Sequence, residues 1–158
     1  MTDYTRRPPK PQQATAAQEN ALPTAIDSKI RLLCQEGYEC FDARDLKAAI
    51  RKFYSAWTLL PKPQTDWEQA GWILTALGDA YFIKGDYDNG CEALSSALHC
   101  PNAKGNPIIH LRLGQCYFEL GELDRAQEQF QWVKQQGAED LFAKEHNKYL
   151  QLLLTETS

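Results

Sequence analysis

The chain contains an internal repeat, which constrains its fold more than any other feature because each copy must form one structural unit. The segment from Leu77 to Pro101 and the segment that begins at Leu113 share Leu-Gly, then Tyr-Phe, then a glycine followed by an acidic residue. These residues keep the same internal spacing in both segments. Gly78 and Gly114 lie 36 residues apart, close to the period of about 34 residues that is typical of stacked helix–turn–helix repeats.

A weaker copy precedes these two segments. Gly37 of this copy aligns with Gly78, and Phe41 aligns with Phe82. The rest of the pattern follows at Ala49, Phe53, Ala56 and Pro61. The copies resemble the tetratricopeptide repeat family in their pattern of Leu-Gly, Tyr, Ala, Phe, Ala and Pro. This resemblance covers roughly residues 30–138 and implies an all-α fold, an α-solenoid of three helix–turn–helix repeats.

The first two copies are spaced too widely for a regular repeat. The distance from Gly37 to Gly78 is about seven residues longer than the period, which predicts an insertion after Pro61. Thr65 and Glu68 have the spacing of a capping box, so we expect them to open the third helix. Side-chain caps of the second, fourth and fifth helices are expected from Asp45, Asp86 and Asn106.

The pattern also divides the chain into segments. Residues 1–22 have little apolar bulk, so we expect a disordered tail. Residues 23–155 are expected to form a single domain. Its repeats are predicted at about residues 30–63, 71–104 and 107–140. The leucine-rich segment at about 138–155 is predicted to cap the last repeat as a helix or helix pair, because terminal repeats leave an apolar face to cover.

Composition limits the class of partner. The formal net charge is −4, whereas nucleic-acid-binding surfaces are basic. No apolar run approaches the roughly 18 residues of a membrane-spanning helix, and no apolar stretch follows Arg6 and Arg7 as in a signal peptide. The five cysteines fit a reduced compartment, with a redox sensor as the alternative. We therefore expect a cytoplasmic protein with no nucleic-acid and no membrane partner.

No residue pattern predicts an enzyme. His99, His110 and His146 lie on different predicted elements, apart from any nucleophile or carboxylate that would complete a catalytic set. Cys91, His99 and Cys100 lack the paired spacing of zinc ligands, and no glycine-rich phosphate loop is present. We expect no catalytic residues, no metal and no cofactor.

The resemblance also implies a partner-binding groove. In the tetratricopeptide repeat family, the first helix of each repeat lines the concave surface. At the corresponding positions the first repeat has Arg31, Tyr38 and Phe41, the second has Trp72, Thr75, Asp79 and Phe82, and the third has Ile108, Leu111, Arg112, Gln115 and Phe118. Aromatic residues with a few arginines are typical of binding hot spots. Alternatively, Phe41, Phe82 and Phe118 only fill the space between neighbouring repeats.

The groove residues indicate the chemistry of the ligand. One groove type of this family clamps a C-terminal carboxylate with Lys and Asn from the first repeat and Lys and Arg from the third. Here Cys34 and Tyr38 replace the first-repeat residues, and only Arg112 matches. The groove therefore suits an apolar peptide or helix with limited charge.

Residues 106–115 resemble one subgroup of the family. Their sequence, N-P-I-I-H-L-R-L-G-Q, is similar to that of small free-standing bacterial three-repeat proteins. Some of those proteins are suspected of accompanying secreted toxins as immunity or helper proteins. The chain is thus expected to be a non-enzymatic protein-binding module with that role. Two alternatives remain open: a type III secretion-like chaperone, and a self-assembling homodimeric structural module.

Overall fold

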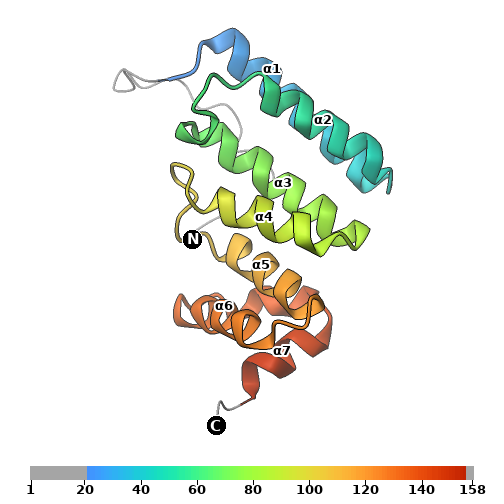
Figure 1. The fold of residues 1–158 in the computed structure, drawn as a ribbon, viewed down its shortest axis with the longest axis vertical. Coiled ribbons are helices and arrows are strands. Elements are labelled where there is room, and N and C mark those ends of the chain that lie inside the picture. The colour runs from blue at the N-terminus through green and yellow to red at the C-terminus, as the bar shows by residue number, and fades with distance from the viewer. Residues whose placement is uncertain (1–20, 156–158) are drawn as a thin grey trace.

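Helices pair off in chain order throughout the computed structural model, which describes residues 21–155 (Figure 1). The paired helices are α1 (Thr24–Asp42) with α2 (Leu46–Thr58), α3 (Glu68–Lys84) with α4 (Tyr87–Ala97), and α5 (Pro107–Glu119) with α6 (Leu123–Gln135). The three hairpins stack along the long axis of the molecule, and the described residues contain no strand. The prediction of an all-α solenoid is confirmed.

One contact recurs inside every hairpin: a glycine on the first helix faces a bulky apolar side chain on the second. The pairs are Gly37 with Phe53, Gly78 with Leu94, and Gly114 with Phe130. A Cβ atom on any of these glycines would lie only 2.4 or 2.5 Å from the facing side chain, well inside van der Waals contact. All three apolar side chains are fully buried. The repeating glycine therefore allows the two helices of each hairpin to approach closely.

Two of the predicted helix caps form as expected, and one does not. Asp45 accepts a hydrogen bond from the backbone N–H of Ala48 at 3.1 Å, and Asn106 accepts one from Ile108 at 3.0 Å. Asp86 lies at the start of α4 but makes no side-chain cap bond. Its carboxylate accepts from the Asn89 side-chain amide instead, at 2.7 Å, and this local bond takes the place of the cap.

The predicted capping box of the third helix is wrong. Thr65 lies in a short 3₁₀ turn, η1 (Gln64–Asp66), and α3 begins later, after Trp67, without a side-chain cap. Two hydrogen bonds that span six or seven residues hold the turn against the end of α2. The Gln64 amide donates to the Trp57 carbonyl at 2.9 Å, and the Trp67 indole donates to the Pro61 carbonyl at 2.8 Å. The residues before Glu68 thus form a turn, and α3, with 17 residues, is still longer than α5, which has 13.

The C-terminal segment covers the last hairpin as a pair of short helices, as predicted. They are the 3₁₀ helix η2 (Glu139–Lys144) and α7 (Asn147–Leu154). Phe142 and Tyr149 are buried and meet the ring of Phe130 edge-on, at centroid distances of 5.2 and 6.1 Å. This capping segment therefore completes the core that α6 would otherwise leave open.

The N-terminal boundary of the packed region lies slightly earlier than expected. Leu22, placed in the tail by the sequence, is buried against the core of the first two hairpins. Residues 1–20 of the predicted tail lie outside the described residues. Within residues 21–155, no helix combines the length and the apolar character needed to cross a membrane.

Candidate functional site

The predicted groove residues all lie on α1, α3 and α5, the first helices of the three hairpins. Six of them are half-buried: Arg31, Phe41, Trp72, Phe82, Ile108 and Phe118. The other six are buried: Tyr38, Thr75, Asp79, Leu111, Arg112 and Gln115. The expectation that they form one exposed surface is therefore wrong for half of the set, because neighbouring first helices contact each other directly. Their role in binding stays a prediction.

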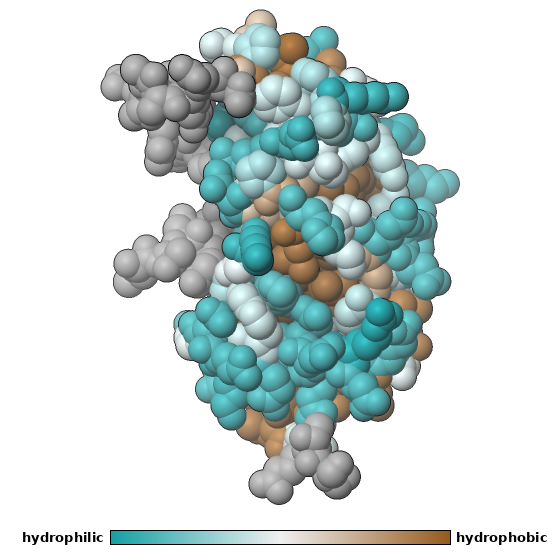
Figure 2. All heavy atoms as spheres, turned by 60° about the vertical axis from the view of Figure 1, so that its left-hand side comes forward, coloured by the Kyte–Doolittle hydropathy of each residue, from teal (hydrophilic) through white to brown (hydrophobic). Residues whose placement is uncertain are grey.

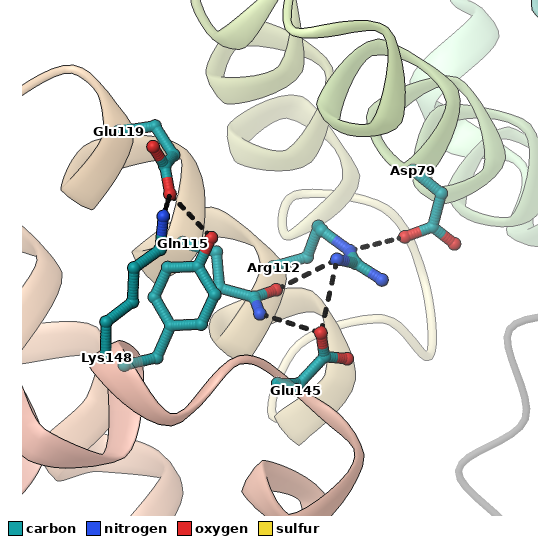
Figure 3. A network of polar contacts seen from close by, with 7 residues as sticks. Asp79, Arg112, Gln115, Glu119, Glu145 and Lys148 are labelled. Atoms are coloured by element: carbon teal, nitrogen blue, oxygen red, sulfur yellow. Dashed lines mark hydrogen bonds and ion pairs between the residues drawn. The ribbon is translucent and has the colours of Figure 1, made fainter.

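A buried ion pair joins the second hairpin to the third. Arg112 of α5 donates from Nε to Oδ1 of Asp79 on α3 at 2.8 Å, and the two side chains are 3% and 0% exposed (Figure 3). The guanidinium also lies over the ring of Phe82, 4.4 Å from its centroid. Burying two charges is costly unless they are paired and hydrogen-bonded. Here the pairing fixes the position of α5 relative to α3.

The polar network continues from α5 into the capping segment. Arg112 Nη1 donates to Oε1 of Gln115 at 3.0 Å, and the Gln115 amide donates to Oε2 of Glu145 at 3.0 Å (Figure 3). The same Glu145 oxygen lies 3.8 Å from Arg112 Nη1. One arginine thus faces carboxylates from α3 and from the break between η2 and α7. Its positive charge is offset within the protein.

A second polar contact fastens the capping segment to the end of α5. The Tyr149 hydroxyl donates to Oε1 of Glu119 at 2.7 Å, and the Lys148 ammonium forms an ion pair with the same oxygen. Burial alone would raise the pKa of Glu119, but Lys148 and Tyr149 outweigh it and lower that pKa. The Tyr149 ring also meets Phe118 edge-on, with centroids 5.2 Å apart. Phe118 is thereby covered in part by α7.

A pocket of about 470 Å³ opens between α5 and the capping segment. It is lined by Ile108, Leu111, Arg112, Gln115, Asp140, Leu141, Lys144 and Glu145. We call these eight residues the α5–cap groove. Its α5 wall consists of predicted groove residues, whereas sequence reasoning missed the other wall entirely. The signal for it was weak: the isolated cation Arg112 needed a carboxylate partner, but nothing in the sequence pointed to Glu145.

Two other predicted residues, Arg31 and Trp72, meet at the opposite end of α3. Arg31 lies over the ring of Trp72, 4.5 Å from its centroid, and its Nε donates to Oδ2 of Asp27 at 2.9 Å. The Gln69 amide donates to the other oxygen of Asp27 at 2.7 Å. Trp72 and Phe82 are separated by about 15 Å of helix rise. The predicted residues therefore do not gather in a single cluster.

The arrangement of potential metal ligands and of apolar surface can be compared over the described residues. Within residues 21–155, no group of histidine, cysteine, aspartate and glutamate side chains has the arrangement of a metal site. Figure 2 shows apolar side chains gathered in a hollow at the level of α3 to α5, surrounded by hydrophilic residues. A hollow of this kind suits contact with an apolar surface more than acid–base chemistry.

Comparison with known proteins agrees with the fold. A family model described as Tetratricopeptide repeat matches residues 108–131, which include nearly all of α5 and most of α6. No curated protein matches the chain. All-α repeat folds of this type are typically non-catalytic interaction modules. The matched residues are thus similar to a tetratricopeptide repeat, a motif that is typical of protein–protein interaction modules in general.

Proposed function

We propose that this protein is non-enzymatic and binds an apolar peptide or helix of another protein in the α5–cap groove. The observation that carries the proposal is the groove itself, a pocket of about 470 Å³ between α5 and the capping segment. Pockets of about 300–1,000 Å³ accommodate ligands of drug size, which corresponds to one or two side chains of a peptide.

The lining of the groove argues for an apolar ligand with limited charge. Ile108 and Leu111 on one wall and Leu141 on the other provide aliphatic surface. Arg112 at the base is already paired with Asp79 and lies near Glu145, so it presents no uncompensated positive charge to a ligand carboxylate. The exposed side chains of Asp140 and Lys144 also line the groove, so a mainly apolar ligand with limited charge can find both apolar and polar partners there.

A capture experiment with matched variants tests the proposal. The full chain is immobilised, proteins of the native cell that bind it are identified by mass spectrometry, and the affinity of the main partner is measured. We expect Leu141→Lys to weaken binding by about 2 kcal/mol, the scale of an interface hot spot. The control is Leu32→Lys on α1, where the same substitution falls on an exposed leucine far from the groove along the stack. A folded Leu141→Lys variant that binds with parental affinity would contradict the proposal.

The biological role within this function is proposed from the sequence resemblance alone. An immunity or helper protein would bind a secreted toxin, whereas a type III secretion-like chaperone would bind a translocated protein before export. The identity of the captured partner separates these roles. A toxin supports the first, a translocator supports the second, and a partner of neither class contradicts both.

A second candidate function, homodimer assembly, is favoured by one exposed residue. Leu154 on the last turn of α7 is 63% exposed, the largest exposed fraction among the large apolar residues of residues 21–155. Exposed apolar surface at the end of a solenoid suits contact with a second copy. Sedimentation equilibrium checks this candidate: a dimer that Leu154→Glu converts to a monomer supports it, and a monomeric parent contradicts it.

A further inference from the structure

Two thiols that the groove does not use lie against each other between the second and third hairpins. Cys91 is in the first half of α4, and Cys116 is on α5. Cys116 is the group with the largest effect on the acidity of the Cys91 thiol, and neither cysteine forms a disulfide. The Cys116 sulfur also lies only 3.0 Å from where a Cβ atom of Gly90 would stand. The missing side chain at Gly90 therefore leaves the space in which the Cys116 thiol reaches α4.

The two thiols differ in exposure and acidity. Cys91 is half-buried, whereas Cys116 is fully buried. The hydrogen bond from Cys116 lowers the pKa of Cys91, and nearby Arg125 acts in the same direction, against burial and the carboxylates of Glu122 and Asp88. The same hydrogen bond and burial raise the pKa of Cys116. This is the arrangement of an attacking thiolate beside a second, resolving thiol.

Two other cysteines of the chain lack this asymmetry. Burial raises the pKa of Cys34 to about 12 and the pKa of Cys100 to about 11. The Cys100 thiol donates to the backbone carbonyl of Ser96 at 3.6 Å. Thiols in such surroundings stay protonated and react slowly, so neither Cys34 nor Cys100 matches the pair at the α4–α5 boundary.

We propose that Cys91 and Cys116 form a reversible disulfide when the protein meets a hydroperoxide, so that a covalent bond joins the second hairpin to the third. The Cys91 thiolate attacks one oxygen of the peroxide, the O–O bond breaks, and the released alkoxide takes a proton and leaves as an alcohol. Cys91 is then a sulfenic acid. The Cys116 sulfur attacks the Cys91 sulfur, and the sulfenic hydroxyl leaves as water with the Cys116 proton. Two thiols lose two electrons, and the hydroperoxide gains them.

The position of the pair gives the bond a structural consequence. Cys116 follows Gln115, which lies at the base of the α5–cap groove and bonds to Arg112. A bond from Cys116 to α4 holds α5 against the second hairpin. It therefore removes freedom between the two hairpins in the unfolded and partly opened states. The chemistry itself does not depend on the proposed binding function.

Peptide mapping of the full chain tests the proposal. The reduced protein is treated with hydrogen peroxide, blocked with iodoacetamide and digested with trypsin. We expect a cross-linked peptide that joins residues 85–104 to residues 113–125, lighter by two hydrogen atoms than the two peptides together and separated by dithiothreitol. We also expect the oxidised protein to unfold at a higher temperature than the reduced protein.

Matched variants identify the cysteines. The tryptic peptide 85–104 contains both Cys91 and Cys100, so Cys100→Ser is the control for Cys91→Ser. We expect the cross-link to persist in Cys100→Ser and to disappear in Cys91→Ser. In Cys116→Ser, a sulfenic acid at Cys91 should become trappable by dimedone. A cross-link that survives in Cys91→Ser, or a parent protein whose other cysteines oxidise while this pair stays reduced, would overturn the proposal.

Discussion

Two arginines lie over aromatic rings at opposite ends of α3, and their surroundings differ in a way that separates the two junctions of the solenoid. Arg31 lies over Trp72 and pairs with Asp27 at 2.9 Å, with 21% of its side chain exposed. Arg112 lies over Phe82 and pairs with Asp79 at 2.8 Å, with 3% exposed. The geometry of the two pairs is nearly the same, but only the second is removed from water.

The difference in exposure between the two ion pairs indicates which contacts stabilise each junction between neighbouring hairpins. The Arg31 pair joins residues of a single helix in partial contact with water, and such pairs contribute about 0.2–1 kcal/mol. The Arg112 pair joins α5 to α3 in the interior, where the loss of one partner leaves the other charge buried. The junction between the first and second hairpins thus has polar contacts in partial contact with water, such as the bond from Gln69 of α3 to Asp27 of α1. The junction between the second and third depends on a polar network that must remain complete.

Removal of the buried arginine should have the largest effect. We expect Arg112→Ala to lower the free energy of unfolding by about 3–5 kcal/mol, because Asp79 is left as a buried charge. The matched variant Arg31→Ala should lower it by about 1 kcal/mol or less. Urea denaturation followed by circular dichroism measures both values. Equal losses in the two variants would mean that the junctions do not differ as the structure indicates.

Adding a side chain at the glycine contact inside a hairpin should lower the free energy of unfolding by an intermediate amount. This loss should not depend on the contacts between hairpins. We expect Gly78→Ala to cost about 1–3 kcal/mol, since the new methyl group would stand 2.4 Å from Leu94. Gly71→Ala on the same helix is the control, because its nearest neighbours lie 3.4 Å away and alanine favours the helix by about 1 kcal/mol. Thermal unfolding of both variants checks the ordering. A stable Gly78→Ala protein would contradict the packing described for the hairpins.

A drop in pH should cause the smallest loss of stability. We expect this loss to come from His110, which is not part of the network around Arg112. His110 on α5 stacks on Trp132 with ring centroids 3.8 Å apart, and burial lowers its pKa against the opposing hydrogen bond with Gln129. The unfolded chain then binds a proton at higher pH than the folded one. Stability should fall as the pH drops below about 6.5, the ordinary histidine value. Unfolding of the parent and of His110→Phe at pH 7.5 and 5.5 isolates this loss, which should be smaller in the variant.

Much of the fold was predictable because its determinants are local or repeat with the chain. Gly37, Gly78 and Gly114 recur with the bulky residues that face them, so the hairpins follow from the spacing alone. Asp45 and Asn106 cap their helices through bonds to residues two or three positions away. Thr65 fails as a cap because Gln64 and Trp67 bond to carbonyls at and just beyond the end of α2. Nothing in the neighbouring sequence reveals these bonds.

The residues of the candidate site also separate into those that local sequence predicts and those that only packing brings together. Position within the repeat identified the α5 wall of the groove, including Ile108 and Arg112, because helical periodicity determines which residues share a face. Whether a side chain on that face is buried depends on how closely the next hairpin stacks, and whether its charge is balanced depends on residues far along the chain. Glu145 and Cys91 reach α5 only after the helices have packed. The sequence alone determined the helices and their pairing. Tertiary packing decided which side chains are buried, which charges are paired and which thiols meet, because these features depend on distances between residues that lie far apart in the chain.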